Sequence, residues 1–560
     1  MRKESATRSA SQTSHHTTDR LHRLHPLLRK MRFREENNYL SVHAVAGTHC
    51  VLLGLDVKGY GKPKPESIDL HAMLSGMALD PERLNHENVQ VASPPVTTTA
   101  DINVGSSSST VFVGFSIDRQ DQVTKQIVSL NAGGKPIQKF HFGDYTALPG
   151  KQYVYTVGKM IKSSIAVDST AQFVVDGSPV ALTVSTEDPT EGTHGIFFNR
   201  GAAGSKAYSE KFGEFRKFHI VHHLDKPEWQ SIINPRSIPD PEKSDEARTW
   251  LSRGLEEALL QFIAQASGSE YRLLAAVYEF THEETIQAFA SAIERGVDVK
   301  IIRHCKGTFR TRVRGNIIEK DENGKIVKDW IPDSTTEEAT KAIDAVGFDN
   351  MKTAYIWHND TFIERRHSSG LMHNKFIILL KNEKPISLWT GSINFTDSEI
   401  ARKKGIEYKD YYDFVQRREN RIAYGAVLHP NAKDDASGEC LTGLNTFVDY
   451  VHTKYLIVDA LTDNPLVVTG SANFSVASTD KNDENSLVIR GDTRVADIYF
   501  TEFMRLFDHF YSRDKYNQYW HQDSSGDRGR LWGEVVADES WLDPYFDPST
   551  QLYRERLLLR

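Results

Sequence analysis

The chain has 560 residues, several times the roughly 150 residues of a typical domain, so the sequence predicts more than one domain. Its composition, with 39% hydrophobic and 26% charged residues, excludes a wholly disordered, fibrous or collagen-like protein. A formal net charge of −7 argues against a polycation that coats nucleic acid or an anionic membrane, although a local basic groove is compatible with it.

Residues 1–38 are predicted to form a basic disordered tail. The part from Met1 to Arg34 is rich in Lys and Arg and poor in Asp and Glu, and Pro26 interrupts its apolar stretch. This pattern lacks the continuous apolar core of a secretion signal, and an organelle transit peptide is the alternative. No apolar run approaches the roughly 18 residues of a membrane span. The three cysteines, Cys50, Cys305 and Cys440, give neither a zinc spacing nor a disulfide framework, so a cytoplasmic location is favoured.

Residues 39–225 are predicted to form a β-sandwich-like accessory domain. Short runs rich in β-branched and aromatic residues, such as Tyr153 to Val157, alternate with Gly, Ser and Pro turns. The segment near 58–110 contains Lys-Pro pairs and a serine run, which indicates a surface insertion. The proline-rich residues 226–243 then predict a linker.

Residues 244–515 have the alternating pattern of an α/β domain. After an amphipathic helix that Ser244 precedes, we expect a strand at 271–280, a helix and a second strand at 297–302. A capping box of Thr281 and Glu284 is expected to start the helix between these strands, and Gly296 to end it. Residues 516–560 are predicted to be a C-terminal extension packed on this catalytic domain.

Two segments of this domain repeat each other at a constant offset, which aligns His373 with His452 and Lys375 with Lys454. In each copy an apolar run follows the lysine, and Thr-Gly-Ser-x-Asn-Phe comes next. Histidine and lysine are two positions apart, and such side chains leave the same face of a strand, so each lysine is expected to lie beside its histidine. An isolated His-x-Lys fits a buried histidine and a solvated lysine. Polar identities in register in two copies favour a shared function instead.

The second copy has the pattern H-x-K-x-x-x-x-D with Asp459 in the acidic position, then G-S-x-N, and Asn482-Asp483-Glu484-Asn485 follows. These motifs resemble those of the phospholipase D superfamily, the HKD phosphodiesterases, over about residues 245–515. The front domain, with Phe198-Asn199-Arg200-Gly201, resembles the accessory module of some bacterial members. The resemblance implies a two-lobed phospholipase D-like α-β-α catalytic domain. It places Asp459 among the catalytic residues, in a supporting role, and pairs Glu484 with His373 of the opposite copy.

These residue types suit attack on an anionic phosphodiester without a metal or another cofactor. One histidine can attack phosphorus and form a phosphohistidine, while the other protonates the leaving alkoxide and later activates the acceptor, water or an alcohol. Lys375 and Lys454 would neutralise the phosphate oxygens. Side chains that would donate hydrogen bonds to the phosphate are Ser392, Asn394, Ser471 and Asn473. Which histidine attacks stays open at this point, as does the oligomeric state.

We therefore expect a phosphodiesterase. The binding partner that we expect is its phosphodiester substrate, and the head-group phosphodiester of a phospholipid is the favoured one. The alternatives are a nuclease with the same site, which acts on DNA or RNA, and a binding or scaffold protein with a degenerate site. Two departures from the motif keep the last alternative open. Leu380 stands where the first copy should have Asp. The stretch from Thr396 to His452 is also much shorter than the stretch from Tyr271 to His373, so the second lobe is expected to be small.

Overall fold

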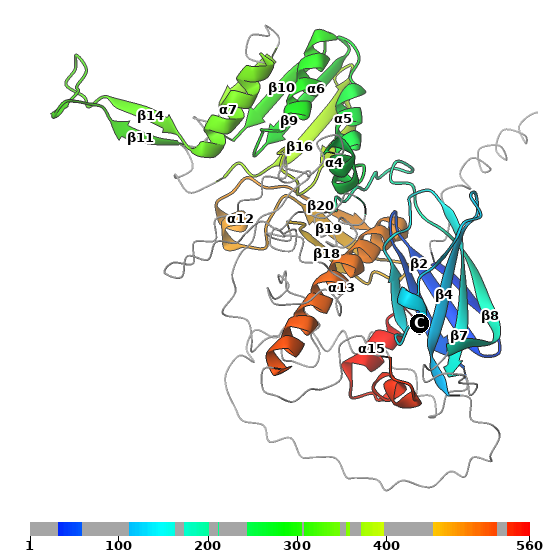
Figure 1. The fold of residues 1–560 in the computed structure, drawn as a ribbon. Helices are drawn as coiled ribbons and strands as arrows, with labels where there is room; N and C mark the ends of the chain where they lie inside the picture. The colour runs from blue at the N-terminus through cyan, green and yellow to red at the C-terminus, as the bar shows by residue number, and fades with distance from the viewer. Residues whose placement is uncertain are drawn as a thin grey trace, which may run out of the picture.

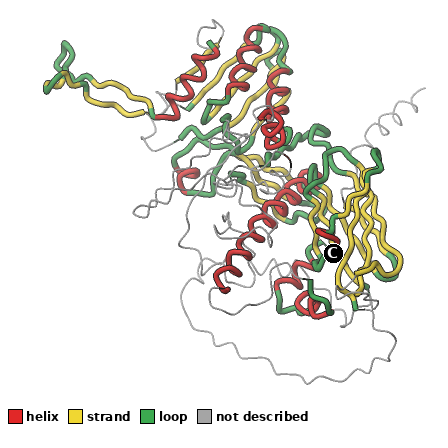
Figure 2. The backbone as a smooth tube through the Cα atoms, viewed as in Figure 1, coloured by secondary structure: helices red, strands yellow, loops and turns green. Residues whose placement is uncertain are grey.

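The structure is a computed structural model, and it describes residues 32–58, 111–162, 173–200, 211, 244–304, 307–347, 354–358, 371–396, 452–523 and 535–559. Within these ranges the chain is a mixed α/β protein built from several separate sheets (Figures 1 and 2). Nearly all of the insertion expected near 58–110 and the whole linker expected at 226–243 lie outside the described residues.

The front part of the chain forms two four-stranded antiparallel sheets. One sheet has the order β1-β2-β3-β6, with β1 (Arg32–Glu36), β2 (Leu40–Ala46), β3 (Val51–Val57) and β6 (His141–Asp144). The other has the order β5-β4-β7-β8, with β5 (Ile127–Ser129), β4 (Phe112–Asp121), β7 (Gln152–Lys162) and β8 (Phe173–Ser185), and a short 3₁₀ helix η2 (Ala132–Gly134) follows β5. Buried side chains alternate along the strands, as at Tyr153, Tyr155 and Val157, and those of both sheets meet in one hydrophobic core.

The first strand corrects the predicted extent of the basic tail. Arg32–Glu36 pairs with β2 along its whole length, so the expected tail of residues 1–38 is wrong over this strand. Arg32 also donates to Asp497 at 2.8 Å. A sequence pattern cannot reveal this strand, because its side chains are half-buried or exposed and its stability comes from pairing with β2.

The C-terminal extension corrects a second expectation. Over residues 535–559, its described part beyond the end of α13 (Thr493–Asp523), it forms a 3₁₀ helix η6 (Glu539–Leu542), α14 (Asp543–Phe546) and α15 (Gln551–Leu557). Trp541 and Tyr545 lie in the core of the front sheets, and the Trp541 ring packs at 5.4 Å from Phe112 and 5.7 Å from Phe140. The extension therefore packs mainly on the front sheets and not, as predicted, on the catalytic domain.

Replacing Trp541 with alanine is expected to destabilise the front part of the molecule by about 3–5 kcal/mol, because the buried indole leaves a large cavity. Thermal unfolding monitored by tryptophan fluorescence and circular dichroism measures this change. Val123→Ala, a truncation at an exposed position, is the control. An unchanged unfolding midpoint in the Trp541 variant would show that the extension does not close this core.

The middle of the chain forms a five-stranded sheet in the order β15-β10-β9-β16-β17. Its strands are β9 (Tyr271–Val277), β10 (Asp298–Arg303), β15 (Ala354–His358), β16 (Lys375–Lys381) and β17 (Lys384–Thr390). The first three are parallel, and β16 and β17 are antiparallel additions. The accompanying helices are α4 (Ser244–Ser252), α5 (Leu255–Ala264), α6 (Glu283–Glu294) and α7 (Ser334–Val346). Helix α6 is capped by His282, which accepts from the Thr285 amide, and not by the capping box expected at Thr281.

Between β10 and α7 the chain makes a thin arm. Its strands are β11 (Gly307–Thr311), β12 (Val313–Arg314), β13 (Ile317–Ile318) and β14 (Lys328–Pro332). β11 pairs with β14, and β12 pairs with β13. Figure 1 shows the arm reaching away from the rest of the molecule.

The second repeat lies in a smaller sheet in the order β18-β19-β20. It comprises β18 (Tyr455–Val458), β19 (Leu466–Gly470) and β20 (Ser486–Arg490), with α12 (Val476–Asp480) between the last two. A long helix, α13 (Thr493–Asp523), follows and runs without a break through the domain boundary expected at 515. Among the described residues, no helix combines the length and the apolar character that a membrane span requires.

Helix α13 connects the second repeat to the front sheets. Its Val495 and Ile498 pack against Val467 of β19, while its Phe500 and Met504 pack against the front strands. Buried Glu502 accepts from Arg253 at 2.9 Å and from Arg505 at 2.6 Å. Burial acts to raise the pKa of Glu502, but these two guanidinium groups outweigh it and lower the pKa to about 2. The carboxylate therefore stays charged although it is buried.

Candidate active site

One edge of the five-stranded sheet collects the chemistry of the first repeat. Strands β9 and β10 end at this edge and β16 begins there, because Val277 is in register with both Arg303 and Lys375. His373 lies two positions before Lys375, and Tyr278 and Glu279 follow β9 directly. The antiparallel insertion of β16 thus places the start of one strand beside the ends of two others.

The two repeats fold into equivalent hairpins. β16 pairs with β17 and β18 pairs with β19, both antiparallel. In each hairpin the threonine of Thr-Gly-Ser-x-Asn donates to the lysine carbonyl: Thr390 Oγ1 to Lys375 at 3.2 Å and Thr469 Oγ1 to Lys454 at 3.3 Å. The sequence repeat is therefore a structural repeat, down to individual hydrogen bonds.

Both lysines are held in the same unusual way. Lys375 is 1% exposed and its Nζ donates to the carbonyl of His373 at 2.7 Å. Lys454 is 7% exposed and its Nζ donates to the carbonyl of His452 at 2.6 Å. Burying an ammonium group is costly, and two such groups beside two histidines create a strong site for an anion.

The two histidines lie close to each other although they come from different sheets. Their ring centroids are 6.4 Å apart, with the ring planes at 70°. A phosphorus atom between the rings can lie about 3 Å from a nitrogen of one while its leaving oxygen lies within hydrogen-bond reach of the other. The structure thus brings His373, Lys375, His452 and Lys454 into one site.

Glu484 joins this site from the segment that precedes β20. Both of its carboxylate oxygens lie 3.0 Å from His373 Nδ1, which is the pairing that the family resemblance implied. Burial acts to raise the pKa of Glu484, but hydrogen bonds from His373, Ser471 and Asn482 outweigh it and lower the pKa to about 2. The carboxylate is therefore ionised at neutral pH.

Burial lowers the pKa of His373 below its usual value, and Lys375 acts in the same direction against the opposing effect of Glu484. Its imidazole is therefore neutral at pH 7. A carboxylate on Nδ1 fixes the tautomer in which Nε2 carries the lone pair, so Nε2 can act as a nucleophile.

The segment that carries Glu484 runs beside the first repeat and is bonded to it. Met372 and Asp483 form a parallel bridge, in which the His373 amide donates to the Asp483 carbonyl at 2.9 Å. The side chain of Asn485 donates to Asn374 at 3.0 Å. These bonds fix the position of Glu484 relative to His373, although the two belong to different repeats.

The four predicted phosphate donors have different surroundings. Ser471 donates to Glu484 at 2.7 Å, and Asn394 donates to Glu279 at 2.9 Å. Ser392 is half-buried just beyond the end of β17, and Asn473 is exposed beyond β19. Two of the four thus orient carboxylates near the histidines, which differs from the expected direct contact with phosphate.

The acidic position of the motif lies outside this group. Asp459 is exposed in a turn with φ of 52°, at the far end of β18 from Lys454. Leu380, its counterpart, lies five positions along β16 from Lys375, which is roughly 16 Å at the rise of a strand. We predicted Asp459 among the catalytic residues, and its distance from the histidines argues against that. Leu380 for the same reason leaves the site intact.

Several site residues were missed in the sequence. The Tyr278 ring lies 4.8 Å from the His373 ring, with Lys375 Nζ 5.0 Å from its centroid. His304 accepts from the Met372 amide at 3.4 Å. Glu279 is half-buried, and burial raises its pKa although Asn394 opposes the shift. No motif marks these residues, and the only signal was their position after β9 and β10, where open parallel sheets carry their sites.

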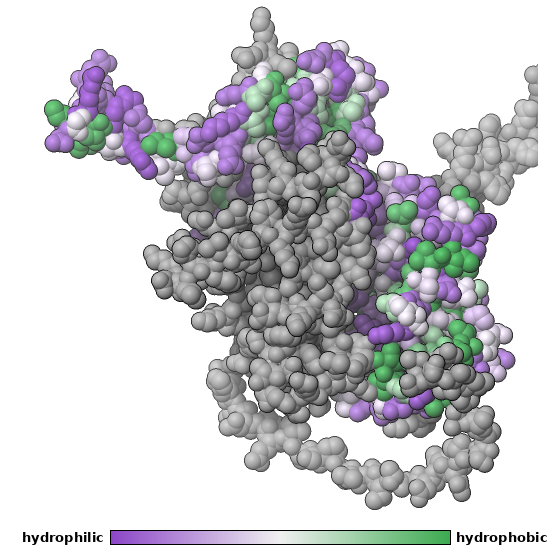
Figure 3. Space-filling view, viewed as in Figure 1, coloured by the Kyte–Doolittle hydropathy of each residue, from purple (hydrophilic) through white to green (hydrophobic). Residues whose placement is uncertain are grey.

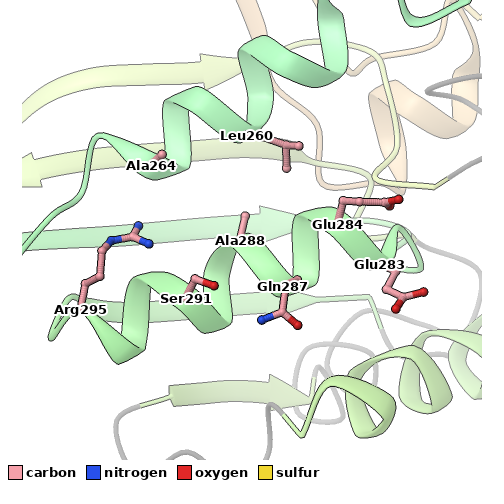
Figure 4. A pocket seen from close by; sticks show the side chains of 8 residues that line it. All are labelled: Leu260, Ala264, Glu283, Glu284, Gln287, Ala288, Ser291 and Arg295. Carbon is pink, nitrogen blue, oxygen red and sulfur yellow. The ribbon is translucent and has the colours of Figure 1, made fainter. Parts of the chain in front are cut away.

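A separate groove lies on the helical face between α5 and α6 (Figure 4). It is lined by Leu260, Ala264, Glu283, Glu284, Gln287, Ala288, Ser291 and Arg295. Next to it, Glu256, His282 and Glu284 have the spacing of metal ligands, and they are the one such group among the described residues. Arg248 occupies this place, since it donates to Glu256 at 2.8 Å and lies 2.6 Å from His282 Nε2. A guanidinium there repels a cation.

Comparison with known families finds a match in the region of the chain that contains the two repeats. The family model described as "Cardiolipin synthase, PLD-like domain" matches residues 259–408 and 428–507, which include both repeats. These residues of the chain match a phospholipase D-like domain. This domain implies a hydrolase that acts on phosphoric diester bonds.

The chain is also similar to a solved phospholipase D family member, Nuc from Salmonella typhimurium. The two sequences are 16% identical over 46% of this chain and 87% of that chain, with a TM-score of 0.11. No curated protein sequence matched the chain.

The glycines of the two Gly-Ser-x-Asn motifs give a matched pair for mutagenesis. A Cβ on Gly470 would lie 2.2 Å from the carbonyl oxygen of Asn485, whereas a Cβ on Gly391 would meet no atom within 4 Å. We expect Gly470→Ala to displace the segment that holds Glu484 and to cost about 1–3 kcal/mol of stability, with a large loss of diester hydrolysis. Gly391→Ala is expected to retain both. Thermal unfolding and turnover of a soluble diester measure this, and equal effects of the two substitutions would contradict the geometry.

Proposed function

We propose that the protein is a metal-independent phospholipase D-type phosphodiesterase that hydrolyses a phospholipid head-group phosphodiester through a phosphohistidine. The observation that carries the proposal is the pair of histidine rings 6.4 Å apart, each followed by a buried lysine. We assign the reaction to five residues, which are His373, Lys375, His452, Lys454 and Glu484; their hydrogen bonds support this assignment.

His373 is the nucleophile in this proposal, because it is neutral and holds Glu484 on Nδ1. Its Nε2 attacks phosphorus, the bond from phosphorus to the head-group oxygen breaks, and His452 gives its proton to the departing alkoxide. Water then attacks the phosphohistidine and gives a proton to His452. The P–N bond breaks, which returns both histidines to their starting states. Alcohol in place of water would yield a new diester by the same steps.

Lys375 and Lys454 act on the phosphate oxygens, which carry the charge of the transition state. Glu484 stabilises the imidazolium character that develops on His373 as the P–N bond forms. Ser471 positions Glu484, and Asn394 positions Glu279 near Lys375. Ser392 and Asn473 remain candidates for direct contact with the phosphate. No step requires a metal ion.

Two observations support a phospholipid as the substrate. The matching family model is described as that of cardiolipin synthase, and cardiolipin is itself a phospholipid. Phe474 is 81% exposed directly after Asn473 of the second motif, so this motif carries an exposed apolar side chain. We propose further that residues 244–515 form two lobes related by the repeat, and that the front sheets form a β-sandwich-like accessory domain. The described second lobe has three strands against five in the first.

The proposal is tested by offering phosphatidylcholine, cardiolipin and single-stranded DNA to the full chain in EDTA. We expect release of a head group from a phospholipid, and loss of that activity in His373→Ala and in His452→Ala. Cleavage of DNA alone would mean that the substrate is a nucleic acid and not a phospholipid. Activity that stops in EDTA would overturn the metal-independent mechanism. If no diester is turned over, the alternative of a binding or scaffold protein with a degenerate site is favoured.

A further inference from the structure

The arm made by β11 to β14 is a candidate interaction surface outside the catalytic site. Its distal part makes two tight turns, at Gly315 with φ of 65° and at Gly324 with φ of 78°. A Cβ at either glycine would meet no atom within 4 Å. Figure 1 shows that the arm leaves the molecule beside α7 and reaches outward. Such an element buries little of itself, so its surface composition indicates what it contacts.

The arm exposes an unusual concentration of large apolar side chains. They are Phe309, Val313, Ile317, Ile318, Ile326 and Ile331. Ile317 at the tip is 73% exposed, and Val313 lies opposite Ile318 across the β12–β13 pair. In Figure 3 apolar patches appear along the arm among hydrophilic residues. Scattered exposed apolar residues are ordinary in soluble proteins, whereas six on a thin projection mark a contact surface.

The charge of the arm differs in sign from that of the whole chain. Residues 307–332 contain six Lys or Arg and four Asp or Glu, a net charge of +2, against −7 for the chain. Arg312 is neutralised by Asp329, whose oxygens lie 2.9 Å and 3.0 Å from its Nε. Arg310 and Arg314 are exposed on either side of it. The arm therefore presents apolar side chains together with basic ones.

The root of the arm lies at the catalytic edge of the five-stranded sheet. β10 ends at Arg303, in register with Val277 and two strands from Lys375. His304, which contacts the Met372 amide next to His373, follows directly, and the arm begins shortly after it, at Gly307. The arm thus leaves the molecule at the edge of the sheet where His373 lies.

We propose that this arm docks the protein on an anionic lipid bilayer. The aliphatic side chains at its tip would enter the interface between head groups and acyl chains, while Arg310 and Arg314 contact anionic head groups. Aliphatic residues at the tip suit acyl chains better than nucleic acid, whose bases stack on aromatic side chains. The inference rests on the proposed phospholipid substrate and gives that substrate a surface from which it is taken.

The test measures sedimentation of the full chain with vesicles of phosphatidylcholine alone and of equal parts of phosphatidylcholine and phosphatidylserine. The double variant Ile317→Asp with Ile318→Asp probes the apolar tip, and Arg314→Glu probes the charge. Val123→Asp is the matched control, since Val123 is 75% exposed in the turn between β4 and β5. Hydrolysis of bis(p-nitrophenyl) phosphate, a soluble diester, is measured in parallel for every protein.

We expect wild type and Val123→Asp to bind the mixed vesicles, and the Ile317 and Ile318 variant to bind about tenfold or more weakly. Arg314→Glu should weaken binding to the mixed vesicles only. All four proteins should hydrolyse the soluble diester at similar rates. Equal vesicle binding by wild type and by the arm variants would overturn the docking role. It would also be overturned if the arm variants bound vesicles normally but no longer bound DNA or no longer self-associated. A wild-type protein that binds vesicles but does not hydrolyse the diester would instead refute the proposed catalytic function.

Discussion

Replacing His373 with alanine is expected to lower diester hydrolysis by on the order of 10⁴-fold or more, whichever leaving group the substrate carries. The reason is that this variant lacks the nucleophile, so no covalent intermediate forms. His452→Ala is expected to behave differently. With an alkoxide leaving group it loses about 10²- to 10⁴-fold, because the departing oxygen receives no proton.

The difference between the two variants appears with bis(p-nitrophenyl) phosphate, whose p-nitrophenolate leaves without a proton. His452→Ala should then release a stoichiometric burst of p-nitrophenolate and stall, since no base activates the water of the second step. His373→Ala should show no burst. His194→Ala, at a histidine on the surface that pairs with Asp492, is the control and should match wild type. Identical behaviour of the two site variants with both leaving groups would contradict the division of labour between them.

Replacing Glu484 with glutamine is expected to give the second largest effect, a fall in kcat/KM of about 10²- to 10⁴-fold at pH 7. The carboxylate raises the pKa of His373 against burial and Lys375, so its removal lowers that pKa further. A nucleophilic imidazole is inactivated when pH falls through its pKa. The acid limb of the kcat/KM profile, already below the usual histidine range, should therefore move to still lower pH in the variant.

The matched control is Glu279→Gln, which removes a half-buried carboxylate that contacts Asn394 and not His373. It should leave the position of the acid limb unchanged. A Glu484 variant with a lower plateau and an unshifted limb would mean that this carboxylate only supports the fold. Kinetics of a soluble diester between pH 4 and pH 8 separate the two cases.

The sequence predicted those parts of the site that depend on local patterns. The constant offset between the repeats identified both His-x-Lys pairs, because identical polar residues in register are not required by packing alone. The β-α-β order from Tyr271 to Arg303 was readable from its hydrophobic periodicity. The partner of Glu484 came from family resemblance, since nothing local to the motif indicates which histidine it meets.

The features that sequence reasoning missed depend on contacts between distant segments. Tyr278 and Glu279 come to the site because β16 inserts antiparallel beside β9, which no local pattern reveals. Trp541 belongs to the core of the front sheets although it lies near the opposite end of the sequence from their strands. The motif also predicted a role for Asp459 in the site. Strand β18 separates this residue from His452 and Lys454, which come before the strand.

The central claim is that His373 becomes covalently attached to phosphorus without a metal ion. The most direct measurement is to quench the His452→Ala protein during its reaction with bis(p-nitrophenyl) phosphate in EDTA and to analyse its peptides by mass spectrometry. We predict an acid-labile p-nitrophenyl phosphoryl group on the peptide that contains His373, and none in His373→Ala. Absence of any adduct while p-nitrophenolate is released, or an adduct on another residue, would contradict the mechanism.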